Sequence, residues 1–184
     1  DAVYAVQELW QAARKPVNLV MLLDTSGSMR GSKIEGMQDA AEQFIQHMGD
    51  EDTISLIEFY TEADLLIDQA SVGSDRAPAI EAVRNLQPGG ETTLFDAIGT
   101  GAELVQASAS PDVVNAIVVL TDGMDTSSTR FQFDDDLIAA ATAGQFDVQD
   151  GAVDPERAHR RDLRGLDEEA AVHQVGVEAR RNRQ

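Results

Sequence analysis

Short apolar runs that stop abruptly at polar residues mark the predicted strands of this chain. Residues 19–23 and 115–120 are apolar almost throughout, and each run is followed by a polar turn segment. Such runs are typical of strands that are buried on both faces in the centre of a parallel sheet. Residues 53–60 are β-branched and largely apolar and predict a further strand, with residues 64–70 as its antiparallel partner across a short link.

Apolar residues that recur at steps of three and four predict the helices. This spacing occurs over residues 32–48, 77–86 and 94–107. It resumes after residue 136, where three consecutive aspartates would complement the positive end of a helix. Strands and helices in this order predict an α/β fold, a doubly wound and mostly parallel sheet with helices on both faces.

The bulk composition limits the classes of function. A length of 184 residues is enough for one domain with a core and short for two. A formal net charge of −19 argues against nucleic-acid binding, because the phosphates would be repelled. We expect no transmembrane segment, because no apolar stretch reaches about 18 residues. The absence of cysteine excludes disulfides, thiolate metal sites and cysteine nucleophiles.

Oxygen-bearing side chains gather where the predicted buried strands end. Asp24, Ser26 and Ser28 directly follow the first of these strands, and Asp122 follows the second. Thr92 lies in a loop between two predicted helices, after a Gly-Gly pair that lets backbone segments approach closely. Because the carboxyl ends of parallel strands share one rim of the sheet, these side chains are predicted to converge there. Oxygen ligands suit Mg²⁺, Ca²⁺ or Mn²⁺ rather than zinc or copper.

The first of these segments also has a simpler interpretation. Aspartate and serine open ordinary turns and cap helices, so residues 24–28 are equally compatible with a strand-to-helix turn that is capped by Ser28 or Ser32. The Asp-x-Ser-x-Ser pattern alone does not separate the two interpretations. The other two segments are needed to decide.

Taken together, three ordered segments resemble von Willebrand factor type A (VWA) domains of the bacterial type. Residues 24–28 (DTSGS) resemble the metal-ion-dependent adhesion site (MIDAS) of the family, and residues 89–98 (GGETTLFDAI) resemble its threonine loop. Residues 121–123 (TDG) match its third ligand segment. By the register of the threonine loop, Thr92 rather than Thr93 is the expected ligand. The resemblance implies the VWA fold, in agreement with the predicted α/β sheet.

The resemblance also implies a role for each residue of the site. Ser26 and Ser28 would bind a metal ion directly through their hydroxyls, and Thr92 would bind it directly or through water. Asp24 and Asp122 would act largely through water or by orienting the serines. The expected ion is Mg²⁺, with Mn²⁺ or Ca²⁺ as alternatives. A Glu or Asp residue of a partner protein would complete its coordination.

Metal-dependent protein binding is therefore the expected function, and we expect no enzymatic activity. Hydrolysis at such an ion needs a positioned base or nucleophile, and His47, His159 and His173 lie outside the metal segments. Two alternatives remain open. One is a structural VWA module without a competent site. The other is a metal-assisted phosphohydrolase with Asp24 as phosphoryl acceptor, which is disfavoured because Ser26 stands where such enzymes carry a second aspartate.

The pattern divides the chain into three parts. Residues 1–16 are predicted to be a lead-in helix from a preceding domain, residues 17–149 the VWA core, and residues 150–184 an atypical, arginine-rich tail. A diverged tail and a shifted reading frame are both compatible with this composition. We expect regular final strands to be missing, with residues 171–177 as the nearest candidate. The predicted strand over residues 115–120 would then lack an outer neighbour, and the tail would be loosely ordered or irregularly helical.

The lead-in segment resembles bacterial proteins in which a VWA domain follows a solute-binding-like domain. Those proteins are commonly exported and anchored to a membrane. The resemblance therefore implies an extracellular or membrane-anchored location in a bacterium.

Overall fold

One sheet organises the molecule. The computed structural model describes residues 14–108, 110, 112–131, 146–149 and 173–179. Within these residues the sheet has six strands in the order β3-β2-β1-β4-β6-β5. The strands are β1 (Val17–Asp24), β2 (Thr53–Phe59), β3 (Ala63–Ser71), β4 (Val114–Thr121), β5 (Phe146–Gln149) and β6 (His173–Ala179). The helical elements are the short 3₁₀ turn η1 (Gly27–Met29) and the helices α2 (Ser32–His47), α3 (Val72–Arg84) and α4 (Leu94–Ser108).

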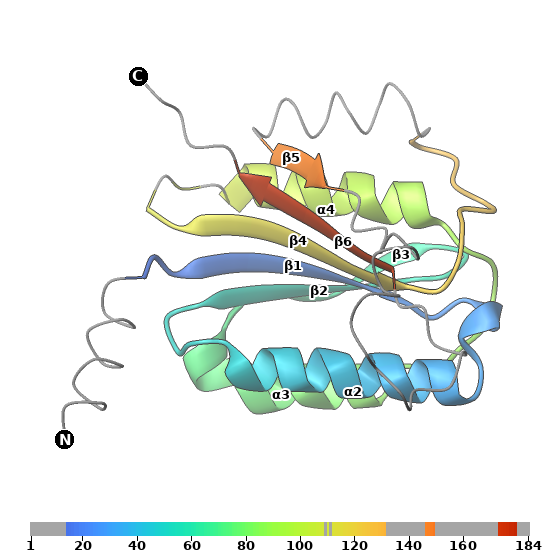
Figure 1. Ribbon diagram of the computed structural model, residues 1–184, viewed down its shortest axis with the longest axis horizontal. Helices are drawn as coiled ribbons and strands as arrows, with labels where there is room; N and C mark the ends of the chain where they lie inside the picture. Colours follow the sequence, from blue (N-terminus) through green and yellow to red (C-terminus); the bar gives the residue numbers. More distant parts are fainter. Residues whose placement is uncertain (1–13, 109, 111, 132–145, 150–172, 180–184) are drawn as a thin grey trace, which may run out of the picture.

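The central strands are parallel and covered by helices on both faces. β1 pairs in parallel with β2 on one side and with β4 on the other, whereas β3 pairs antiparallel with β2. Helices α2 and α3 lie on one face of the sheet and α4 lies on the other (Figure 1). This arrangement confirms the predicted α/β fold with a mostly parallel central sheet.

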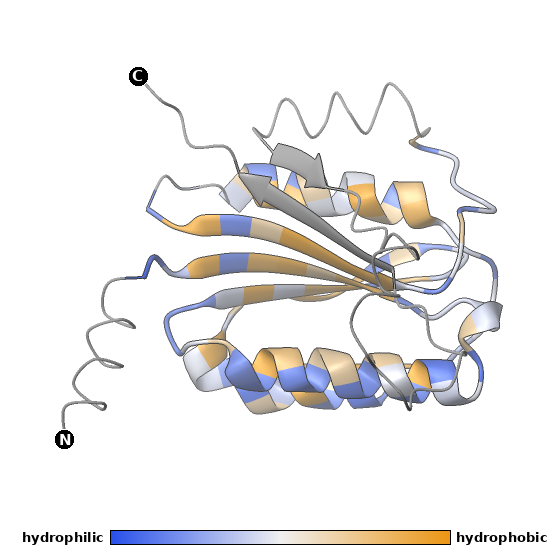
Figure 2. Ribbon diagram, in the orientation of Figure 1, coloured by the Kyte–Doolittle hydropathy of each residue, from blue (hydrophilic) through white to orange (hydrophobic). Residues whose placement is uncertain are grey.

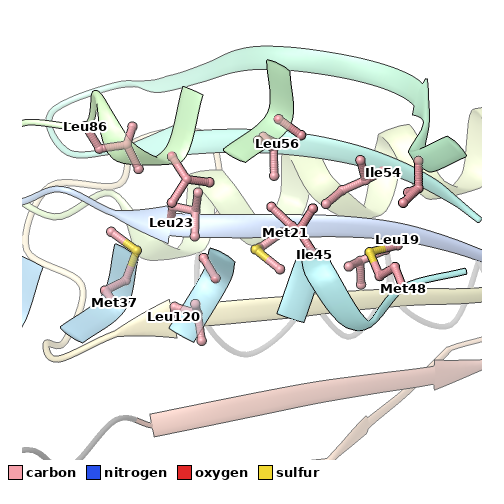
Figure 3. Close-up of a cluster of buried hydrophobic side chains, with 14 of the residues drawn as sticks. Leu19, Met21, Leu23, Met37, Ile45, Met48, Ile54, Leu56, Leu86 and Leu120 are labelled. Carbon is pink, nitrogen blue, oxygen red and sulfur yellow. The ribbon is translucent and has the colours of Figure 1, made fainter. Parts of the chain in front are cut away.

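Strand β1 supplies the core on both faces of the sheet. Leu19, Met21 and Leu23 belong to the hydrophobic cluster shared with α2 and α3, and Figure 3 shows them beside α2 side chains. Val20 and Leu22 belong to the cluster shared with α4. All five side chains are at most 1% exposed. Burying each contributes roughly 1.5–3 kcal/mol, so β1 is a rigid base for the residues that follow it.

Helix α2 forms where the periodicity predicted it. Its buried residues are Ile34, Met37, Ala41 and Ile45, at steps of three and four. Polar residues occupy the opposite face of the helix (Figure 2). The apolar stripe packs on the sheet and fixes the helix directly behind the loop that carries Ser26 and Ser28.

Helix α3 begins earlier than the predicted residue 77. It starts at Val72, and Pro78 lies inside it. Val72 is 0% exposed and joins the same core cluster as α2. The residues after Val72 are small and polar and carry no helical pattern, so packing of Val72 rather than local preference sets the start of the helix.

The sheet continues beyond β4, where we expected an unpaired edge. β6 pairs antiparallel with β4, and β5 pairs antiparallel with β6. Residues 173–179 therefore form a strand that overlaps the candidate at residues 171–177, and the remainder of the predicted tail lies outside the described residues. Pairing satisfies the backbone groups that an exposed edge of β4 would leave open.

Several sequence predictions concern residues outside the described part. These are most of the lead-in helix over residues 1–16, the helix after residue 136, and most of the tail over residues 150–184. β1 begins at Val17, where the core was predicted to begin. Among the described helices, none has the length and apolar character needed to cross a membrane.

Candidate metal centre

Asp24 ends β1 and ties it to the end of β4. The parallel register pairs Leu23 with Leu120, so Asp24 comes to lie beside Thr121. The Asp24 carboxylate is fully buried. Its Oδ1 accepts a hydrogen bond from the Ser26 N–H at 2.8 Å, and its Oδ2 accepts one from the Thr121 hydroxyl at 2.5 Å. Asp24 therefore fixes the start of the serine loop and joins it to the end of the neighbouring strand.

The two serines face Asp122 across the rim of the sheet. Ser26 Oγ and Ser28 Oγ are 2.9 Å apart, and Ser28 Oγ donates to Asp122 Oδ1 at 2.9 Å. Helix α2 follows Gly31 without a side-chain cap, so neither Ser28 nor Ser32 caps it. The capping interpretation is wrong, because the Ser28 hydroxyl is engaged with Ser26 and Asp122.

Thr92 reaches the same rim from the loop between α3 and α4. Its N–H donates to Thr126 Oγ1 at 3.0 Å, and its carbonyl accepts the N–H groups of Thr126 at 2.9 Å and Ser127 at 3.1 Å. A Cβ atom placed on Gly123 would lie 3.8 Å from Ser28 Oγ and 4.0 Å from Thr92 Oγ1. The hydroxyls of Ser28 and Thr92 thus both lie close to Gly123. The structure brings all five predicted residues to one rim.

Two glycines let the serine loop and the threonine loop touch. The Gly27 N–H donates to the Gly90 carbonyl at 3.1 Å, and a Cβ atom on Gly27 would lie 3.1 Å from that oxygen. Gly27 does not have a positive φ, so it is required here for close approach rather than for an unusual backbone conformation. Gly90 does have a positive φ, of 74°.

Gly90→Ala is expected to lower the free energy of unfolding by about 1–3 kcal/mol. The positive φ disfavours alanine, and the new Cβ would lie 2.5 Å from Thr61 Oγ1 and 3.0 Å from Tyr60 Cδ2. Urea unfolding measures the effect. Gly89→Ala is the matched control, since a Cβ atom at Gly89 meets nothing within 4 Å. Equal stability of the two variants would contradict this account of Gly90.

A lysine from α2 also contacts the rim. Lys33 Nζ donates to Asp122 Oδ2 at 2.5 Å. The two oxygens of this carboxylate therefore accept hydrogen bonds from an ammonium and from a serine hydroxyl. The Asp122 side chain is 13% exposed and the Lys33 side chain 44% exposed. The bond lies at the border between the rim and solvent.

The start of α4 is clamped to the segment that follows Asp122. The Asp96 carboxylate accepts the N–H groups of Thr129, Arg130 and Phe131, at 2.9, 2.8 and 2.9 Å. Burial favours the neutral acid, but these hydrogen bonds and the charge of Arg130 outweigh it, so the pKa of Asp96 is held below its ordinary value. The clamp keeps residues 123–131 against α4 and so supports the contacts to Thr92.

The donor set fits a hard divalent cation. Two carboxylates and three hydroxyls supply oxygen atoms only, the ligands that Mg²⁺, Mn²⁺ and Ca²⁺ prefer. In the described part of the chain, no cluster of three or more His, Cys, Asp or Glu side chains offers a different type of metal site. An ion on this rim would therefore depend on the hydroxyls.

The three segments, their meeting point and the central parallel strands between helices are those expected of one family. The sequence profile of the von Willebrand factor type A domain matches residues 19–124, which contain all three segments. The chain belongs to the von Willebrand factor type A domain family. Domains of this family typically serve in adhesion or protein interaction.

Curated relatives share the VWA domain within much longer chains. The uncharacterized protein sll0103 of Synechocystis is 34% identical over 110 residues, which are 60% of this chain and 26% of that protein. The inter-alpha-trypsin inhibitor heavy chain H4 of Sus scrofa is 29% identical over 125 residues, which are 65% of this chain and 13% of that protein. This chain thus spans about a quarter or less of these two relatives.

Solved structures share the fold. A von Willebrand factor type A protein from Catenulispora acidiphila has a TM-score of 0.60 at 24% identity and covers 72% of this chain and 31% of its own. The VWA domain of the type V pilus tip protein Mfa5 from Porphyromonas gingivalis has a TM-score of 0.54 at 23% identity, covering 61% and 40%. A mussel byssus protein, proximal thread matrix protein 1 with a zinc-occupied MIDAS motif, has a TM-score of 0.58 at 12% identity, covering 71% and 35%.

Sequence reasoning missed several residues of this VWA site. Thr121 was part of a matched segment, but its bond to Asp24 depends on strand register. Lys33 did carry a signal, because a lysine in the first turn of a helix opposes the helix dipole unless a carboxylate compensates it. The clamp by Asp96 had no local signal, since its partners lie 33 to 35 residues away.

Proposed function

We propose that this VWA domain is a metal-dependent protein-binding module with a MIDAS. Asp24, Ser26, Ser28, Thr92 and Asp122 would hold one divalent cation, with Mg²⁺ as the expected ion and Mn²⁺ or Ca²⁺ as alternatives. The observation that carries the proposal is the bonded series Ser26–Ser28–Asp122, which joins the ends of β1 and β4 through oxygen atoms alone.

The division of labour within the site follows from burial. Asp24 is fully buried, and both of its oxygens are engaged in orienting Ser26 and Thr121. Ser28 and Asp122 lie nearer to solvent. As the family resemblance implies, the hydroxyls would supply the direct contacts, while Asp24 would orient Ser26 and Asp122 would orient Ser28. Neutral ligands leave a cation electrophilic, so a position facing solvent would accept a Glu or Asp of a partner protein.

Recognition rather than turnover is the proposed outcome. General-base catalysis needs a titratable side chain within hydrogen-bond reach of the reacting group. His47, the histidine whose surroundings the structure describes, donates from Nδ1 to the Gln43 carbonyl of its own helix at 2.6 Å. The pilus tip protein and the zinc-occupied byssus protein are relatives in fold that support adhesion and metal binding as the proposed role. An exported or membrane-anchored location is part of the same proposal.

Calorimetric titration with Mg²⁺, Mn²⁺ and Ca²⁺ tests the metal site. The wild-type domain is expected to bind one ion, and Ser28→Ala to bind it at least about tenfold more weakly, because a ligand and the contact to Asp122 are both lost. Ser32→Ala is the matched control, since this exposed serine lies four residues further along, at the start of α2, and is not one of the five proposed ligands.

Two results would contradict the proposed site. Equal affinity of the wild type and Ser28→Ala would remove Ser28 from it. Absence of binding by the wild type for all three ions would favour the alternative of a purely structural module.

The partner is tested with an acidic peptide and with a phosphoester substrate. A peptide that carries Glu or Asp is expected to bind only while the ion is present, and a chelator should release it. The phosphoester should remain intact. Cleavage that depends on the ion would instead favour the phosphohydrolase alternative.

A further inference from the structure

We propose that Lys33 is an internal counter-cation that competes with the divalent ion and so sets the metal affinity of the site. The inference rests on the proposed function, because it concerns the same rim. It adds a residue outside the five expected ligands and assigns it an effect opposite to theirs.

The contact between Lys33 and Asp122 places a positive charge within the oxygen network. Lys33 Nζ lies 2.5 Å from Asp122 Oδ2, while Asp122 Oδ1 accepts from Ser28 Oγ at 2.9 Å. Ser28 Oγ lies 2.9 Å from Ser26 Oγ. The ammonium is therefore two side chains away from Ser26, at the end of the same bonded series. A cation bound by these oxygens would share a carboxylate with Lys33.

Lys33 lies at the N-terminal end of α2, where the helix itself disfavours a positive charge. Lys33 is the second residue of Ser32–His47, where the helix dipole is positive and a cation is disfavoured. Asp122, which is 89 residues away in sequence, compensates it. The long-range ion pair is thus the favourable interaction that holds the ammonium at the rim.

Competition follows from charge and from the limited number of oxygen atoms. A divalent ion that approaches Asp122 is repelled by the ammonium, and the two cations draw on the same carboxylate. The Lys33 side chain is 44% exposed, so its flexible stem lets the displaced ammonium return to water. Whether the ammonium is displaced or stays beside the ion, metal binding becomes weaker. A higher ion concentration is then needed to occupy the site.

The test compares metal affinities of the full chain and three variants by calorimetry with Mg²⁺ and Mn²⁺ alone. Lys33→Gln is expected to bind both ions about threefold to tenfold more tightly than the wild type, the range for a partly exposed charge. Lys33→Arg keeps the charge and is expected to stay within about twofold of the wild type. Lys15→Gln, at the other lysine of the chain, controls for the change in net charge and is likewise expected to stay within about twofold.

A second measurement does not depend on calorimetry. The rise in Tm on adding Mg²⁺ is expected to be larger for Lys33→Gln than for the wild type, because tighter binding stabilises the folded state more. The difference should shrink as sodium chloride is raised, because salt screens the ammonium.

The outcomes separate this inference from the proposed function. Binding by the wild type, with Lys33→Gln equal or weaker, would overturn the role of Lys33 and leave the metal site in place. An equal gain in Lys15→Gln would also overturn it, because net charge alone would then explain the effect. Absence of binding in every variant would overturn both proposals.

Discussion

Asp24→Ala is expected to abolish divalent-cation binding and to lower the free energy of unfolding by about 2–4 kcal/mol. The carboxylate is fully buried and accepts hydrogen bonds from the Ser26 N–H and the Thr121 hydroxyl. Alanine would leave the Ser26 N–H without its acceptor and the Thr121 hydroxyl with only the long 3.5 Å contact to the Gly123 carbonyl, and it would release the serine loop from β4. Urea unfolding gives the stability, and titration with Mg²⁺ gives the binding.

Asp24→Asn separates the two effects. The amide keeps an oxygen for the Ser26 N–H, and its NH₂ group can donate to Thr121, whose hydroxyl then accepts. Its stability is expected to stay within about 1 kcal/mol of the wild type, while its Mg²⁺ affinity falls by at least about tenfold because a negative charge is lost. Full binding by the well-folded asparagine variant would show that the charge of Asp24 does not contribute to the site.

Asp96→Ala is expected to lower the free energy of unfolding by about 2–4 kcal/mol, without removing any proposed ligand. Three backbone N–H groups, those of Thr129, Arg130 and Phe131, would lose their shared acceptor. The segment over residues 123–131 should then open more often. Because this segment holds the Thr92 backbone through Thr126 and Ser127, Mg²⁺ affinity is expected to fall as well, by a few fold.

Hydrogen exchange locates the effect of Asp96. The amides of residues 129–131 are expected to lose protection in Asp96→Ala by more than the drop in global stability explains. The amides of β1 should lose only as much protection as the global free energy of unfolding falls. Glu103→Ala is the matched control, because this exposed carboxylate pairs with the Arg130 side chain and not with the backbone. A loss of protection of similar size in both variants would contradict the clamp.

The clamp also predicts how stability depends on pH. The pKa of Asp96 is lower in the folded state than its ordinary value. The unfolded chain therefore takes up the proton first as the pH falls. The stabilisation is fully present above the unfolded pKa and is lost as the pH drops through the folded pKa. The free energies of unfolding of the wild type and Asp96→Asn, measured as a function of pH, should accordingly converge below the folded pKa of Asp96.

The apolar and polar pattern of the chain located two of the three segments of the candidate metal site. A buried strand must end where its apolar run ends, so Asp24 and Asp122 could be assigned to the rim from the sequence. Thr92 was assigned through its resemblance to the threonine loop. The α2 helix and the antiparallel β2–β3 pair were predicted for the same reason, because their periodicity is local.

The contacts that shape the site depended on tertiary structure. The bond from Thr121 to Asp24 joins residues 97 apart and exists because β1 and β4 pair in one register. The early start of α3 at Val72 and the pairing of β6 with β4 were likewise set by packing and by backbone pairing between distant segments.

The sequence by itself determined which oxygen-bearing residues lie at the ends of buried strands, because the change from apolar to polar residues is visible in the sequence. Only the tertiary structure decided how those residues are joined: Asp24 to Thr121, Ser28 to Asp122, and Asp122 to Lys33. These bonds span about half of the chain, and no local preference encodes them. They follow from the strand register and from the helix that packs behind the serine loop.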